Sequence, residues 1–180
     1  VQGLTTTQLN SLTTAQVASM ETADVAALSV TQVASLNTAS VAALSSTQAQ
    51  ALTSAQVAGL TTTQIGALET ADLSAMSSAQ LAGLSVTQIG KLSTAQVAAL
   101  TTGQVAGLSA TQVASLSSAA TAALTTSQVQ ALTTAQVAAI TTAKITSLTS
   151  DQVAALTTAQ AKSLTTAQLA KMTTDQLAAM

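Results

Sequence analysis

An eight-residue repeat runs through the whole chain without insertion or deletion. From Leu4 to Ala179 the sequence divides into 22 octads, and the residues outside this range belong to incomplete ones. A strict period of this kind indicates a repeat architecture, in which each unit buries its apolar face against its neighbours. We therefore treat residues 1–180 as a single repeat array and expect no domain boundary within it.

The apolar residues stand at two fixed places in the octad. Counting from the leucine, position 1 is Leu in 18 octads, and position 6 is Val, Ile or Leu in 19. Position 2 is Ser, Thr or Asn in 20 octads, and position 5 is Gln in 17. Polar residues interrupt every octad, whereas a transmembrane helix needs about 20 mostly apolar residues in a row. We therefore expect no membrane insertion.

Each octad carries the signature of a helix start. In LTTAQV (132–137), the Thr133 hydroxyl can cap a helix by accepting a hydrogen bond from an early backbone N–H. Gln136 can reach back to the N–H of Thr133, which completes a capping box, while Leu132 and Val137 occupy the positions of a hydrophobic staple. One capping box is a weak signal, but its recurrence in register predicts one short helix per octad.

The rare charged residues agree with this placement. All acids lie at octad positions 2, 4 or 5, the predicted cap and first turn, where the helix dipole favours negative charge. Lys91, Lys162 and Lys171 lie at positions 7 or 8, the predicted last turn, and Lys144 at position 5 is the exception. The six acids are Glu21, Asp24, Glu69, Asp72, Asp151 and Asp175.

We predict an all-α solenoid of very short helices, one per octad, each with five to seven residues. Such helices are not stable alone, so they must coil around a shared interior formed by positions 1 and 6. A single long helix would spread the Leu/Val stripe over every face, and a long helix or disorder is less favoured than a solenoid of short helices. The alternative is a β-solenoid, although residues five apart would point to opposite faces of a strand.

One octad departs from the pattern at both key positions. Residues 116–123 have Ala120 at position 5 and Thr121 at position 6. This octad therefore lacks both the capping partner and the apolar core residue, and we expect it to be the least stable internal unit.

The composition argues against most kinds of chemistry. The chain has no His, Cys, aromatic residue or Arg, and its basic residues are four lysines. Ser–His and Cys–His pairs, the usual zinc sites and iron–sulfur sites are therefore excluded. We expect no enzyme, no catalytic residue, no cofactor and no metal. Nucleic acid is not an expected partner either, because its binding needs basic side chains or aromatic stacking platforms.

Two acidic pairs and four methionines are the remaining candidates for a site. Glu21/Asp24 and Glu69/Asp72 could form paired-carboxylate or Ca²⁺ sites, but nothing in the sequence supplies the six to eight oxygens that Ca²⁺ takes. We interpret both pairs as capping boxes with substituted residues. Met20, Met76, Met172 and Met180 occupy the leucine position and are predicted core residues.

Hydroxyl groups at positions 2 and 3 form the one abundant surface chemistry. They can cap helices and keep the surface soluble without charge. They can also form a regular array that contacts ice or a polysaccharide, or carry O-linked sugars. The Ala- and Thr-rich composition resembles that of some ice-binding proteins.

Two family resemblances bear on the fold and the function. The phrase Leu-Thr-x-x-Gln-Val, as at residues 132–137, resembles the opening of the DNA-binding repeats of TAL effectors, but the base-reading loop of that unit is missing. The LTTAQVAA-like octads resemble octapeptide-repeat regions of large bacterial secreted or surface adhesin-like proteins. This second resemblance covers the whole chain and implies a stalk or spacer segment.

We therefore expect a structural repeat segment that acts as an extended spacer, stalk or scaffold in a larger extracellular or cell-surface protein. The alternative is a binding module that presents its Thr/Ser array to ice or polysaccharide. Self-association is a further expected interaction, because a rod with few charges repels its copies weakly. The N-terminal VQGLTTTQLN has neither a basic start nor an apolar run, so we expect no signal peptide in it.

Overall fold

The computed structural model describes residues 3–180, which form 22 short helices and no strand. Every helix begins at octad position 3 and has four to six residues, slightly shorter than predicted. The helices are α1 (Thr6–Asn10), α2 (Thr14–Ala18), α3 (Thr22–Ala26), α4 (Val30–Ser35), α5 (Thr38–Ala42), α6 (Ser46–Ala51), α7 (Ser54–Ala58), α8 (Thr62–Ala67), α9 (Thr70–Ala75), α10 (Ser78–Ala82), α11 (Val86–Ile89), α12 (Thr94–Ala99), α13 (Thr102–Gly107), α14 (Ala110–Ser115), α15 (Ser118–Ala122), α16 (Thr126–Ala131), α17 (Thr134–Ala139), α18 (Thr142–Ile145), α19 (Ser150–Ala154), α20 (Thr158–Ser163), α21 (Thr166–Leu169) and α22 (Thr174–Ala178).

The predicted capping box starts these helices. It forms in all 17 octads that have Gln at position 5, with the position 2 hydroxyl accepting from the Gln backbone N–H. In α17, Gln136 N donates to Thr133 Oγ1 at 3.2 Å, and Thr133 N donates to Gln136 Oε1 at 2.7 Å. The box therefore fixes where each helix begins.

The chain turns between helices through extended residues. Leu100 ends α12 with φ −61° and ψ 143°, and Thr101, the cap of α13, has φ −72° and ψ 157°. No residue of the described chain has a positive φ. The helices therefore end without the left-handed glycine that often terminates helices, and each Leu–Thr or Leu–Ser step redirects the chain.

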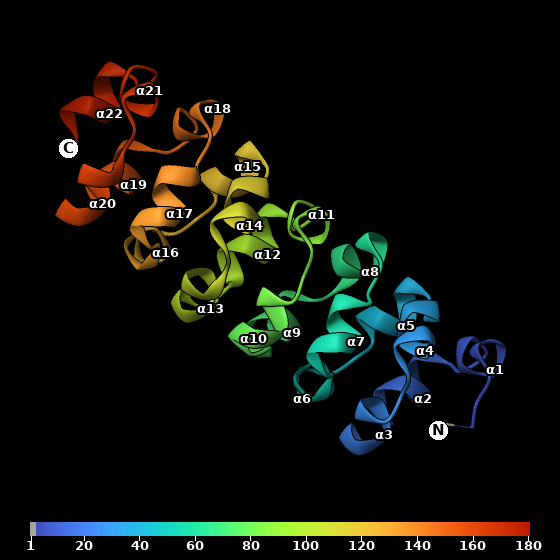
Figure 1. The fold of residues 1–180 in the computed structure, drawn as a ribbon. Helices are drawn as coiled ribbons and strands as arrows, with labels where there is room; N and C mark the ends of the chain where they lie inside the picture. The colour runs from blue at the N-terminus through green and yellow to red at the C-terminus, as the bar shows by residue number, and fades with distance from the viewer. Residues whose placement is uncertain (1–2) are drawn as a thin grey trace.

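The helices coil into an elongated solenoid (Figure 1). Each helix packs against the helix three along, as in the pairs α6–α9, α10–α13 and α14–α17. Figure 1 shows this stack running from α1 at one end to α22 at the other. The all-α solenoid is thus confirmed, and each helix finds its neighbour in the next coil three octads along.

The core is a narrow apolar line along the solenoid axis, made by octad positions 6 and 1 as predicted. Position 6 side chains such as Val57, Val97 and Val137 are fully buried, and position 1 leucines such as Leu60 and Leu132 are almost fully buried. Each buried Val or Leu side chain contributes about 1.5–3 kcal/mol relative to exposure. Because most octads add an apolar residue at both positions, the core grows with the array.

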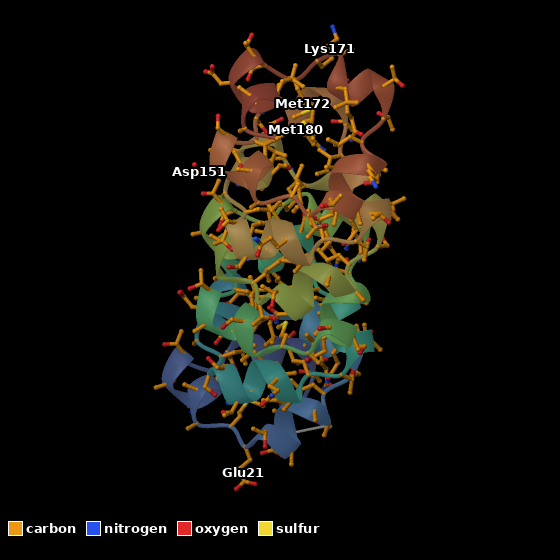
Figure 2. All side chains as sticks on the ribbon, turned by 90° about the vertical axis from the view of Figure 1, so that its left-hand side faces the viewer. Glu21, Asp151, Lys171, Met172 and Met180 are labelled. Atoms are coloured by element: carbon orange, nitrogen blue, oxygen red, sulfur yellow. The ribbon has the colours of Figure 1, made fainter. Side chains whose placement is uncertain are left out.

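The methionines follow the core pattern except at the last residue. Met76 and Met172 are buried, and Met20 packs against the core from a partly buried position. Met180 is 54% exposed, so its prediction as a core residue is wrong. It lies at the C-terminal end of the stack (Figure 2), where Leu169 and Leu177 are also exposed.

The charged residues lie largely where the helix dipole favours them. Asp24, Asp72, Asp151 and Asp175 occupy first turns, and Glu21 and Glu69 occupy N-cap positions. Lys162 lies in the last turn of α20, whereas Lys91 and Lys171 follow directly after the C-caps of α11 and α21. Figure 2 shows Glu21 and Lys171 at opposite ends of the rod.

Candidate functional site

Among the described residues, the acidic side chains do not gather into a cluster. Within residues 3–180, no group of three or more Asp, Glu, His or Cys side chains is placed to hold a metal ion. The longest helices of this part of the chain have six residues, so none of them could cross a bilayer. The polar feature that remains is internal: the line of position 5 glutamines.

Gln136 shows what these glutamines do. Its Oε1 accepts from the N-cap of its own helix, while its Nε2 donates to carbonyls of the preceding coil. Nε2 lies 2.9 Å from Val105 O, 3.4 Å from Ala106 O and 2.7 Å from Leu108 O. These carbonyls end α13 and enter the next turn, where helix carbonyls lack intrahelical partners. One amide thus caps two helices, one at its start and one at its end.

The same bonds recur along the solenoid. Fifteen of the 17 position 5 glutamines donate from Nε2 to a carbonyl 28 residues earlier. Gln8 and Gln16 have no residue 28 places before them in this sequence, and both are exposed. The others are buried. We refer to these fifteen residues as the glutamine ladder: Gln32, Gln48, Gln56, Gln64, Gln80, Gln88, Gln96, Gln104, Gln112, Gln128, Gln136, Gln152, Gln160, Gln168 and Gln176.

The sequence predicted the bond from the N-cap to Oε1 of each ladder glutamine. It did not predict the bonds from Nε2 to the preceding coil. A signal was present, because a capping box accepts Glu as readily as Gln at this position. The chain nevertheless has Gln in 17 octads and Glu in none at position 5. Only the amide supplies a donor as well as an acceptor, so the preference for Gln is explained by the bonds between coils.

Octads without Gln differ in the bonds that their position 5 and 6 residues make. Lys144, the exception in the charge pattern, directs its ammonium Nζ to Ala114 O, 30 residues earlier, as a ladder glutamine directs its amide. In α5, Ser40 is too short to reach the N-cap amide, and Asn10 from the preceding coil accepts from Asn37 N at 2.9 Å instead. In α15, the Thr121 hydroxyl donates to Ser117 O at 2.9 Å within the helix.

The acidic pairs do not form the capping boxes that we predicted. Neither Glu21 nor Glu69 makes a side-chain hydrogen bond to its helix, so their interpretation as substituted boxes is wrong. A Ser or Thr side chain is short and can accept from the nearby backbone N–H at the helix start. The Glu side chain is longer and makes no such bond here. Asp24, in the first coil, is partly buried. Asp72 is buried and contacts Ser46 of the preceding coil.

Burial raises the pKa of Asp72 above its usual 3.8, and the nearby Glu69 carboxyl adds to the increase. The Ser46 hydroxyl, which donates to Asp72 Oδ1 at 3.0 Å, and the Glu69 backbone N–H oppose this rise in pKa. The pair Glu69/Asp72 therefore differs from Glu21/Asp24 in its surroundings and not in its sequence spacing.

Comparison with known protein families matches this repeat. The family model described as the ALTTAQ repeat matches residues 17–54, 65–102, 99–134 and 134–166, which together make up most of the chain. The chain belongs to the ALTTAQ-repeat family. Neither a curated protein nor a solved structure matches it.

The six letters of the ALTTAQ repeat correspond to one helix start. Residues 131–136 read ALTTAQ and contain the core leucine Leu132, the cap Thr133 and the ladder residue Gln136. The motif that defines the family is therefore also the set of residues that starts a helix and joins it to the preceding coil.

The ALTTAQ repeat exposes hydroxyls at a regular interval of eight residues along the sequence. Position 2 hydroxyls cap their helices, except that of Thr141, whereas position 3 threonines are the first helical residues and largely face solvent. Exposed examples at position 3 are Thr94, Thr102, Thr126, Thr134, Thr142, Thr158, Thr166 and Thr174. Position 3 is thus the part of the predicted hydroxyl array that remains free for an external partner.

Proposed function

We propose that this ALTTAQ-repeat array is an extended spacer or stalk segment of a larger extracellular protein of the bacterial adhesin-like kind. The glutamine ladder carries this proposal. It joins each coil to the preceding one in a fixed register of 28 residues. Added octads therefore repeat the same interface, and the length of a solenoid can change without redesign of its contacts.

The structure also suits a spacer because its polar groups serve the fold. The buried amides bond to backbone carbonyls, and the few charged side chains are distributed over several helices. A stack held by such bonds keeps a fixed distance between its two ends. A flexible linker of equal residue number would instead sample many lengths.

The experiment is to place arrays of different octad number between two fluorescent domains and measure their separation by energy transfer and by X-ray scattering. We expect the separation to increase linearly with the number of octads. A Gly/Ser linker with the same number of residues is the control, and its mean separation grows about as the square root of its length. Square-root growth of the array itself would contradict the spacer proposal.

The exposed position 3 threonines support a second candidate, a module that binds ice or polysaccharide. The triple variant with Thr126, Thr134 and Thr142 changed to Lys replaces exposed hydroxyls without entering the core. Under this candidate, the variant loses activity in ice-recrystallisation or glycan-array assays and keeps its circular dichroism spectrum. The matched control changes the same three residues to Ser. If the parent array binds neither surface, this second function is rejected.

A further inference from the structure

Asp72 in α9 has an unpaired oxygen inside the solenoid. Its side chain is 3% exposed, and Oδ1 accepts the Ser46 hydroxyl at 3.0 Å. Oδ2 is buried without a hydrogen-bond partner, and no other buried side-chain oxygen or nitrogen of the described residues is in this condition. A buried charged oxygen without a partner is costly, so the surroundings of Asp72 call for a further group.

The repeat register identifies what faces Asp72. Ladder glutamines donate to the carbonyls 31, 30 and 28 residues earlier, as Gln104 does to Leu73, Ser74 and Met76 at 2.6–3.2 Å. The same offsets from Asp72 give the carbonyls of Val41, Ala42 and Leu44, and no side chain of residues 3–180 donates to them. The bond from Ser46 places the Asp72 carboxylate beside this segment.

Another octad shows that such a set of carbonyls accepts a cation. Lys144 stands at the same octad position as Asp72, and its ammonium bonds to the carbonyl of Ala114, 30 residues earlier. At Asp72 the side chain ends in oxygens and is one methylene shorter than glutamine. The carbonyls therefore lack the positive hydrogen-bonding group that they meet in the neighbouring coils.

We propose that Asp72 and the carbonyls of Val41, Ala42 and Leu44 bind a small oxygen-ligating cation, Ca²⁺ or Na⁺, between two coils. Carboxylate, hydroxyl and carbonyl oxygens are the ligands that such hard cations take. Glu69, one turn earlier at the N-cap, adds a second negative charge and favours the divalent ion. The sequence alone indicated no metal, because these backbone oxygens belong to a coil 28–31 residues away.

The test compares two matched acids. Asp72→Gln installs the residue that the repeat uses in most octads and supplies the missing donor, so this variant folds and has no cation site. Asp24→Gln is the control, because Asp24 also follows a glutamate by three residues but has no residue 28 places before it. Chelator-treated parent and variants are titrated with CaCl₂ by calorimetry at pH 7, and with NaCl in place of choline chloride at constant ionic strength.

We expect one Ca²⁺ or one Na⁺ to bind per chain in the parent and in Asp24→Gln, and none in Asp72→Gln. Binding to the folded state should raise the Tm of the first two proteins by about 2–4 °C near saturation. The titration that shows binding, with CaCl₂ or with NaCl, identifies the ion. Absence of binding in the parent, or equal binding in Asp72→Gln, overturns the proposal and assigns the unpaired oxygen to a protonated carboxyl. This result would not affect the spacer proposal, whose test measures length.

Discussion

At the scale of single residues, the ladder glutamine is the group on which both the helix start and the contact between coils depend. Changing Gln136 to Glu tests the two roles separately, because Glu keeps the acceptor for Thr133 N and loses the donor to Val105 and Leu108. The variant also places a buried carboxylate against carbonyl oxygens. We expect the free energy of unfolding to fall by about 3 kcal/mol, as measured by urea denaturation followed by circular dichroism.

Gln16 provides the control for this change. It forms the same capping box but is exposed, and no residue of this sequence stands 28 places before it. Gln16→Glu should therefore change stability by no more than about 0.5 kcal/mol. Equal losses in the two variants would show that the amide donor contributes nothing between coils.

Asp72 gives the solenoid a predicted pH dependence in buffer without added Ca²⁺ or Na⁺. Its pKa in the folded state is raised above the 3.8 of an unperturbed Asp, chiefly by burial. Between these two values the folded state holds a proton that the unfolded state has released, so stability falls as pH rises through this window. Glu69 lies beside Asp72, whereas α6 and α12, which pack against α9, contain no charged residue.

Melting temperatures of the parent and Asp72→Asn, followed from pH 3 to pH 7, measure this effect. The parent should lose stability as pH rises above about 4, relative to Asp72→Asn, which cannot ionise at this position. Asp24→Asn should retain the slope of the parent. Parallel curves for the parent and Asp72→Asn would show that Asp72 titrates alike in the folded and unfolded states.

At the scale of elements, Gly59 and Gly107 at octad position 8 approach Val30 and Ser78 at position 3 of the preceding coil. A Cβ added at Gly59, at position 8, would lie 2.3 Å from Cγ1 of Val30, at position 3 of the preceding coil. Gly59→Ala should therefore destabilise the protein by about 1–2 kcal/mol, and Val30→Ala should restore most of this loss. A double-mutant cycle by thermal denaturation measures the coupling.

Gly66 is the control for the element-scale contact. It lies within α8, and a Cβ added there meets nothing within 4 Å. Gly66→Ala should stabilise the protein by about 0.5–1 kcal/mol, because alanine favours helix more than glycine does. If Gly59→Ala behaved like Gly66→Ala, the close approach of the two coils at Val30 would be disproved.

The helix predicted to be weakest from the sequence is α15, and the structure adds a reason. Ala120 makes no bond to the preceding coil, and Thr121 fills the core position with a side chain that bonds within its own helix. We expect amides of residues 120–123 to exchange with solvent faster than those of 136–139, where Gln136 joins the coils. Hydrogen-exchange mass spectrometry checks this, and slower exchange at 120–123 would contradict it.

The sequence predicted the contacts within an octad but not those between coils. The helix starts were predictable because Thr133, Gln136 and their equivalents act within four residues of one another. The contacts between coils depend on residues 28–31 apart, as for Gln136 and Leu108, and no local pattern specifies that distance. The surroundings of Asp72 were not predictable either, because they come from the preceding coil. In sequence, both Asp24 and Asp72 follow the same residues, Glu-Thr-Ala.

At the scale of the whole molecule, the solenoid is a repetition of one interface, and its register follows from the octad. Each helix packs on the helix three along, and each ladder bond spans a fixed number of residues. Removal of one complete octad therefore presents equivalent residues to every neighbouring coil. Removal of four residues places polar positions 2 and 5 where positions 6 and 1 belong.

These deletions form the last prediction. Deletion of residues 132–139 should preserve a cooperative thermal transition, with a small loss of stability because one nearest-neighbour interface of many is removed. Deletion of residues 132–135 brings Gln136 to the place of Leu132, which buries an amide in the core and disrupts coils on both sides. We expect this second variant to lose helical circular dichroism and several degrees of Tm. Equal effects of the two deletions would show that the octad is not the structural unit.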